Sequence, residues 1–378
     1  MSKTSSIPLS EPNGKQLAAD GLEYPLIVIG ASAGGVEALS QLVQHLPADL
    51  AAALFVVVHF PPHSISLLPK ILSRAGPLPA KHVQDQAAIQ PGAIYVAPPN
   101  HHLLVRRGYM RLSHGPRENG HRPAIDTLFR SAARAYGPQT VGVILSGTLG
   151  DGTAGLRVIH AAGGITVAQD PEEALFDSMP RTAIESVPID YVLKIEAIAQ
   201  LLEQLTASWT PSQPFQKHGN QHTAQNRTEE EPAVTHGMDR EDEMVAQDKA
   251  ILEQGKRPGT ASTFTCPDCG GVLWELRENN IIRYRCHVGH AYSLDSLVSE
   301  QADDLERALW SAVRALEEKA ALARRMAAQA RHQHRALSEA QFLDRANEAT
   351  QHADLVRQVI LQQTGLRLEG DNGLKSEG

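Results

Sequence analysis

Short apolar runs alternate with amphipathic stretches through the first half of the chain. The apolar runs are too short for independent helices and indicate buried strands at Leu26–Ile29, Ala53–Val58, Ala93–Ala97, Val141–Leu145, Ile165–Ala168 and Tyr191–Leu193. Stretches with helical spacing lie between several of them, at Val36–Leu46, Ala124–Tyr136 and Gly155–Ala162. Strands that alternate with helices predict an α/β domain at residues 23–207, with a doubly wound, mainly parallel, Rossmann-like sheet.

The pattern changes after this domain. Residues 208–262 are rich in Gln, His, Pro and Glu and contain few apolar residues, which predicts a disordered linker. A compact segment at residues 263–295 then holds the cysteines. We expect the two ends of the chain, residues 1–22 and 367–378, to be flexible.

Residues 296–366 contain no proline and are rich in Ala, Leu, Arg, Glu and Gln. Their apolar residues recur every three or four positions, at Leu305, Leu309, Val313, Leu316 and Ala320. This stripe is typical of an amphipathic helix that packs on a partner, so we expect a helical hairpin or a coiled coil. The pattern leaves open whether these helices also mediate self-association or receptor docking.

Length and charge narrow the functional classes. A chain of 378 residues exceeds what one hydrophobic core usually fills, so two or three units are expected. The formal net charge of -8 argues against electrostatically driven binding to nucleic acid or to an anionic membrane. No run reaches the ~20 apolar residues that span a bilayer, and the N-terminus has no apolar run of signal-peptide type. We therefore expect a cytoplasmic protein without direct membrane insertion.

A serine lies at the predicted turn between the first strand and the first helix. Ser32 is surrounded by small residues, including Ala33 and Gly34, which permit close approach of the backbone. The N–H groups of such a turn, at the start of a helix, could stabilise an oxyanion. The same segment also resembles a phosphate-binding turn. It departs from the dinucleotide fingerprint only at the middle glycine.

Two further polar residues follow predicted strands. His59 comes directly after Ala53–Val58, and neutral imidazole is the usual general base for a serine nucleophile. Asp151 lies in the glycine-rich turn after Val141–Leu145, where a carboxylate could orient that imidazole. Taken singly, each residue has an ordinary structural interpretation, as a solvated histidine or a helix-capping aspartate. Together they predict a Ser-His-Asp triad at one edge of the sheet.

The order Ser, His, Asp differs from the α/β-hydrolase order, which disfavours a common lipase-like enzyme. The domain instead resembles the catalytic domain of CheB-type protein-glutamate methylesterases, which act on bacterial chemotaxis receptors. The resemblance covers about residues 25–200 and rests on six collinear strings: IGASAGGVEAL, VVHFPP, IYVAPPNHHL, HRPAIDTLF, VGVILSGTLGDGTAGL and FDSMPRTAI.

This resemblance implies hydrolysis of glutamate methyl esters on receptor helices, and in many members deamidation of glutamine. It makes Ser32 the nucleophile, His59 the base, Asp151 its partner and the backbone N–H of Thr148 an oxyanion donor, with Ala33 and Gly34 in the same pocket. The family usually has methionine at the position of Thr148. No cofactor is expected for catalysis, and the expected partner is a chemotaxis receptor or a similar coiled-coil signalling protein.

Other shared residues are expected to be structural rather than catalytic. These are His101, His102 and Arg122. Too few residues precede Leu26 for the phosphoacceptor receiver domain that normally regulates these enzymes, so we expect regulation by the C-terminal half or by another protein.

Cys266, Cys269 and Cys286 are the three cysteines of the chain, and their odd number and clustering favour a metal site over disulfides. With His290 as fourth ligand they have the spacing of a zinc ribbon, whose four filled positions would make the Zn²⁺ structural. His287 is the alternative fourth ligand.

Two other functions remain open alongside the methylesterase. One is a regulatory or scaffold module with little turnover, and the other is a serine esterase or amidase for small molecules.

Overall fold

The computed structural model describes residues 24–60, 66–210, 259–278 and 281–363. The contacts within the chain divide it into two compact units, residues 1–297 and 298–378. Most of the predicted linker and both predicted flexible ends lie outside the described residues. Among the described residues, no helix is both long enough and apolar enough to cross a membrane.

The first unit is built around a parallel seven-stranded sheet in the order β3-β4-β2-β1-β7-β8-β9. Its strands are β1 (Leu26–Ala31), β2 (Ala53–Val58), β3 (Ala80–His82), β4 (Ala93–Val96), β7 (Thr140–Ile144), β8 (Ile165–Gln169) and β9 (Tyr191–Leu193). Neighbouring strands pair in parallel throughout, as in Ala31 beside Val58 and Gly30 beside Ile144. The predicted doubly wound α/β fold is therefore confirmed.

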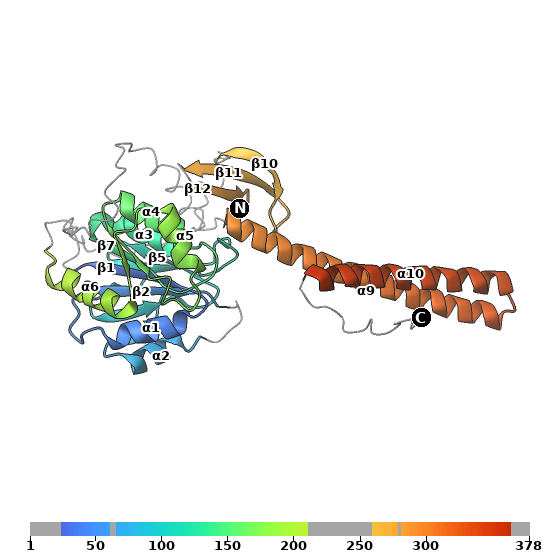
Figure 1. Ribbon diagram of the computed structural model, residues 1–378, viewed down its shortest axis with the longest axis horizontal. Helices are drawn as coiled ribbons and strands as arrows, with labels where there is room; N and C mark the ends of the chain where they lie inside the picture. Colours follow the sequence, from blue (N-terminus) through green and yellow to red (C-terminus); the bar gives the residue numbers. More distant parts are fainter. Residues whose placement is uncertain (1–23, 61–65, 211–258, 279–280, 364–378) are drawn as a thin grey trace, which may run out of the picture. The chain divides into compact units, whose positions relative to one another are not determined.

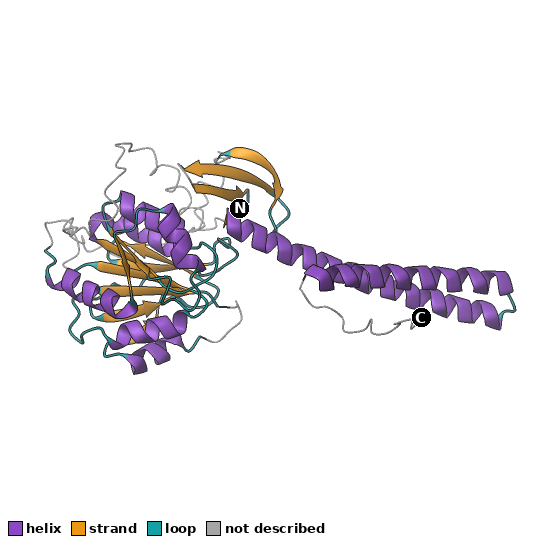
Figure 2. Ribbon diagram, in the orientation of Figure 1, coloured by secondary structure: helices purple, strands orange, loops and turns teal. Residues whose placement is uncertain are grey.

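Helices cover both faces of this sheet (Figures 1 and 2). One apolar cluster joins the sheet to α1 (Gly35–Gln44), α2 (Leu68–Ala75) and α6 (Ile195–Ala207). A second cluster joins the opposite face to α3 (Ile125–Tyr136), α4 (Thr153–Ala161) and α5 (Ser178–Ser186). A hairpin of β5 (His102–Arg106) and β6 (Tyr109–Ser113) packs into the second cluster. Because strands such as β1 and β2 are buried on both faces, their sequences are continuously apolar rather than alternating.

A small antiparallel sheet of four strands follows in the same unit, and we call residues 259–293 the cysteine module. It consists of β10 (Thr260–Thr265), β11 (Val272–Glu278), β12 (Ile281–Cys286) and β13 (Ala291–Ser293). Its apolar core is small and includes Leu273, Tyr292 and Leu297. β10 begins inside the segment that the sequence assigned to the linker, because its polar, exposed residues give no apolar signal.

The second unit pairs two long helices, α9 (Leu294–His332, which begins in the first unit) and α10 (Ala336–Gln363). Contacts between Arg331 and Glu339 and between Arg324 and Thr350 show that the helices run antiparallel. Of the predicted stripe, Val313 and Ala320 are buried, whereas Leu305 is 48% exposed.

Candidate active site

Ser32, His59 and Asp151 meet at the carboxyl edge of the parallel sheet. Ser32 follows β1, His59 follows β2 and Asp151 lies in the loop after β7; β1 is the strand between the other two. The His59 Nδ1 atom is 3.1 Å from Ser32 Oγ, and His59 Nε2 is 2.8 Å from Asp151 Oδ2. The structure thus joins the three predicted residues in one hydrogen-bonded chain.

The hydrogen bonds of His59 define its tautomer. An ionised carboxylate only accepts hydrogen bonds, so Nε2 must carry the proton that is donated to Asp151. In the neutral ring Nδ1 is then the acceptor for the Ser32 hydroxyl proton. This is the arrangement that a general base needs before a serine attacks.

Asp151 is fully buried, and it accepts several hydrogen bonds. Its Oδ2 accepts the Ile125 N–H (2.7 Å), while Oδ1 accepts the Asp126 N–H (3.1 Å) and the Asn119 side-chain amide (2.8 Å). Burial alone would raise the pKa of Asp151, but the bond to His59 and those from the first turn of α3 lower it to about 2. Asp151 therefore stays ionised and holds His59 in one orientation.

A second buried carboxyl, Asp126, lies beside Asp151. It accepts the Gly155 N–H at 2.7 Å and the Asn119 amide at 3.1 Å. Burial, followed by the negative charge of Asp151, raises the pKa of Asp126 to about 6. Asn119 donates to both carboxyl groups through Nδ2, so it links them.

The turn that carries Ser32 is fixed by Ser146, at the end of the β7 region. The Ser32 N–H donates to the Ser146 carbonyl at 3.0 Å, and the Ser146 hydroxyl donates to the Ala33 carbonyl at 2.8 Å. Gly34 has φ of 70°, a left-handed conformation that favours glycine, and it is the N-cap of α1.

Two N–H groups near Ser32 are available for an oxyanion. Across the described part of the chain, those of Ala33 and Thr148 have no backbone acceptor. Thr148 follows Gly147, at which an added Cβ would lie 2.9 Å from Ser32 Cβ. The predicted donors therefore lie near the serine, and Thr148 itself is exposed.

His121 stacks on His59, with ring centroids 3.6 Å apart and planes inclined by 16°. Burial, with a smaller contribution from His59, lowers the pKa of His121 to about 3, so its ring is neutral at neutral pH. No sequence pattern indicated this contact, although His121 begins one of the family strings.

Arg122 and His102, which also lie in the family strings, have structural partners. The Arg122 guanidinium donates to the Asn100 side chain and to the carbonyls of His114 and Gly115. His102 is buried, which lowers its pKa to about 4, and it lies between the Pro116 carbonyl and the Ala124 N–H. None of these bonds involves the triad, in agreement with the structural roles expected for both residues.

The four predicted metal ligands also lie together. The ligand atoms of Cys266, Cys269, Cys286 and His290 are all within 4.8 Å of one another. The His290 Nδ1 atom is 3.6 Å from Cys266 Sγ and 3.5 Å from Cys286 Sγ. Tetrahedral zinc with Zn–S bonds of about 2.3 Å separates its ligands by about 3.8 Å, so the set fits the ion. His287 is exposed and is not part of the group.

Sequence reasoning missed Asn119, Asp126 and His121 as parts of the site. His121 and Asp126 lie in one of the family strings, which was the only sequence feature that pointed to them. Asn119 lies outside these strings. Their roles depend on how the loop before α3 crosses the sheet edge, which no local pattern encodes.

Comparisons with known proteins identify the family of the α/β domain. The family model described as CheB methylesterase matches residues 27–202. A putative protein-glutamate methylesterase/protein-glutamine glutaminase of Leptospira interrogans is 40% identical over 185 residues, which are 49% of this chain and 96% of the Leptospira protein. The protein-glutamate methylesterase/protein-glutamine glutaminase of Pectobacterium atrosepticum is 39% identical over 187 residues, 48% of this chain and 53% of that protein.

Among solved structures, the Thermotoga maritima CheB methylesterase catalytic domain is 32% identical, with a TM-score of 0.48. The match covers all of that chain and 49% of this one. The Leptospira protein is matched over nearly its whole length at 40% identity. On that similarity, this chain belongs to the CheB methylesterase family.

Proposed function

We propose that the first unit hydrolyses methyl esters of glutamate side chains on another protein, with Ser32 as nucleophile, His59 as general base and acid, and Asp151 as the group that orients His59. The observation that carries the proposal is the hydrogen-bonded chain from Ser32 Oγ through His59 to Asp151. Membership of the methylesterase family and the names of the relatives support the choice of substrate.

The chemistry follows from this chain. Ser32 Oγ attacks the ester carbonyl carbon while its proton passes to His59 Nδ1, and the carbonyl oxygen becomes an oxyanion. His59 then donates that proton to the methoxy oxygen, which leaves as methanol. Water attacks the acyl-enzyme, His59 takes its proton, and the return of the proton to Ser32 Oγ releases the glutamate. A glutamine side chain would react in the same way with ammonia as the leaving group.

The oxyanion would be bound by the backbone N–H groups of Ala33 and Thr148. Such donors act where charge develops in the transition state, and the first turn of α1 adds a favourable dipole. The exchange of the usual methionine for Thr148 leaves a backbone donor in place, because the side chain takes no part in that bond.

The proposed substrate is a chemotaxis receptor or a similar coiled-coil signalling protein. With such a partner, we expect the protein to act in the cytoplasm. A partner with methylated glutamates on an exposed helix would present the ester to Ser32.

We also propose that the cysteine module binds one structural Zn²⁺ through Cys266, Cys269, Cys286 and His290. Support comes from the proximity of the four ligand atoms and from the small apolar core of the module. Thiolates and imidazole that fill four positions give stability to a segment with few buried apolar side chains.

The test is methanol release from methyl-labelled receptors by the full chain and by its Ser32→Ala variant. We expect release by the wild type and its loss, by a factor of about 10³ or more, in the variant. Ser40→Ala is the matched control, because Ser40 is on α1 and bonds only within the helix, to the Val36 carbonyl. Methanol release that survives in Ser32→Ala would exclude the assigned nucleophile.

The alternatives give different results in the same experiment. Rapid turnover of free small esters without release from receptors would indicate a small-molecule esterase. Receptor binding without hydrolysis, and without labelling of Ser32 by a fluorophosphonate, would indicate a scaffold.

A further inference from the structure

We infer that Asn119 is a positioning residue for Asp151 and that the cysteine module holds Asn119 in place, so that metal loading of the module supports catalysis. The inference rests on the proposed function for the role of Asp151. It is carried by a continuous set of hydrogen bonds and buried ion pairs within the first unit.

Asn119 is 2% exposed. Its side-chain amide forms hydrogen bonds both with the carboxyl groups of the active site and with the cysteine module. On one side Nδ2 donates to Asp151 Oδ1 at 2.8 Å and to Asp126 Oδ2 at 3.1 Å. On the other side Oδ1 accepts the N–H of Ser293, in β13, at 2.7 Å. One amide group therefore connects the triad carboxylate to the module.

The backbone makes the same connection. The Asn119 N–H donates to the Ala291 carbonyl at 2.6 Å, and the Ala291 N–H donates to the Arg117 carbonyl at 3.1 Å. Glu118 pairs with Ala291 as an isolated parallel bridge, so the loop contacts the backbone of β13 along its edge. Asn119 has φ of 52°, a left-handed conformation that needs support from its surroundings.

A buried charge cluster fixes the residue before it. Glu118 is fully buried and accepts hydrogen bonds from Arg130 of α3 (2.7 Å) and from Arg285 of β12 (2.7 Å). Arg283 of β12 lies 3.7 Å away. Burial would raise the pKa of Glu118, but the three guanidinium groups outweigh it and hold the pKa well below its ordinary value. Removing one partner from a buried cluster of this kind is strongly destabilising.

The cluster and the bridge both lead to the metal ligands. Arg285 also donates to the carbonyl of Gly289, which lies between Cys286 and His290 in the chain. Ala291, which bonds to Asn119, directly follows His290. A metal that holds Cys286 and His290 would therefore hold the turn from which both contacts arise.

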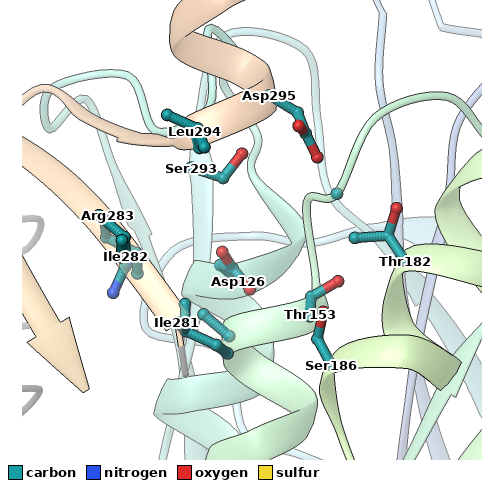
Figure 3. A pocket seen from close by; sticks show the side chains of 12 residues that line it. Asp126, Thr153, Thr182, Ser186, Ile281, Ile282, Arg283, Ser293, Leu294 and Asp295 are labelled. Carbon is teal, nitrogen blue, oxygen red and sulfur yellow. The ribbon is translucent and has the colours of Figure 1, made fainter. Parts of the chain in front are cut away.

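The junction between the cysteine module and the α/β domain is not fully packed. A cavity of about 210 Å³ lies between Asp126, Thr153 and Thr182 on one side and Ile282, Arg283 and Ser293 on the other (Figure 3). The coupling thus depends on the directional bonds described above, and these would be lost together if the module unfolded.

The first experiment compares Asn119→Ala with the wild type in full-length, metal-loaded protein. We expect kcat to fall about 10- to 100-fold, as for loss of a hydrogen bond to a charged group, with KM changed less than about threefold.

The second experiment tests the module itself. Arg285→Ala should slow fluorophosphonate labelling of Ser32 about tenfold, whereas Arg277→Ala should not, since Arg277 is an exposed residue of β11 that pairs with Glu275. A small probe is used because its reaction does not depend on docking of a receptor.

The third experiment removes the metal from the full chain with a chelator and follows hydrogen exchange. We expect residues 117–126 to lose protection together with residues 260–293, and re-addition of Zn²⁺ to restore both. Protection of residues 117–126 that survives unfolding of the module would overturn the inference, as would an Asn119→Ala variant with unchanged kcat. If the wild type neither labels nor hydrolyses, the proposed function fails, while the exchange data still decide whether the module holds Asn119.

Discussion

The ring of His121 lies flat against the ring of His59, with centroids 3.6 Å apart. Because burial lowers the pKa of His121 to about 3, this neighbour stays neutral while His59 gains and loses a proton. The stack therefore restricts the orientation of His59 without adding a second positive charge beside it.

Substituting His121 should separate packing from charge. We expect His121→Ala to lower kcat about three- to tenfold, which corresponds to the loss of an aromatic pair, and His121→Phe to retain most activity. Steady-state kinetics on methylated receptor measure both. Equal losses in the two variants would show that a property of imidazole other than its flat face is needed.

Gly34 and Gly92 offer a matched pair for testing the nucleophile turn, since their φ values are 70° and 71°. Alanine should cost each position about 1 kcal/mol of backbone strain. At Gly34 the added Cβ would lie 2.8 Å from Ser146 Oγ, whereas at Gly92 it would meet nothing within 4 Å. We expect both variants to lose thermal stability but only Gly34→Ala to lose kcat. A normal kcat in Gly34→Ala would mean that Ser146 does not set the position of Ser32.

Thr148 tests the oxyanion donor. Thr148→Ala keeps the backbone N–H and should change kcat little, whereas Thr148→Pro removes it and should lower kcat about 10²- to 10³-fold. Circular dichroism of the proline variant checks that the fold is intact. Comparable activity of the two variants would assign the oxyanion to other groups.

The sequence predicted the sheet and the triad for the same reason. Parallel strands bring their carboxyl ends to one edge, so Ser32, His59 and Asp151 could be placed together from strand ends alone. The clustering of the three cysteines with His290 was likewise predictable, because their spacing is local. Neither prediction required knowledge of how distant segments pack.

What the sequence did not reveal depends on long-range contacts. Glu118 and Arg285 are 167 residues apart, and nothing in either segment indicates the other. Strand β3 was missed because it is short and only partly buried. The predicted apolar stripe on α9 began too close to the N-terminus of the helix, since Leu305 is exposed. Periodicity shows that a helix has an apolar face, but not how much of that face a partner covers.

The raised pKa of Asp126 predicts a pH-dependent cost in stability. The pKa is about 6 in the folded protein and 3.8 in the unfolded reference, so the folded state binds the proton more tightly. Stability from this group is fully present below pH 3.8 and is lost as pH rises through about 6. Relative to Asp126→Asn, the wild type should lose about 2 kcal/mol between pH 4 and pH 7.

The measurement is the difference in free energy of unfolding between the two proteins at each pH. The variant loses one hydrogen bond at every pH, since an amide cannot accept from both Gly155 and Asn119 as the carboxylate does. Only the pH-dependent part of the difference therefore reports the titration. A difference that is constant from pH 4 to pH 7 would contradict the raised pKa.

The histidines of the cysteine module make the metal site testable without reference to activity. His290 lies within 3.6 Å of two cysteine sulfurs, whereas His287 is exposed and apart from them. We expect about one zinc per chain in the wild type and in His287→Ala, and a loss of most of it in His290→Ala after dialysis. The midpoint temperature of thermal unfolding of the module should fall in the variant that loses zinc, because the metal supplies folding free energy that the small apolar core does not. If His287→Ala released the metal and His290→Ala retained it, the fourth ligand would be reassigned. Ala291, which bonds to the loop of Asn119, directly follows His290. With His287 as the ligand, the metal would no longer hold the residue next to Ala291, and another contact would have to keep Ala291 in place.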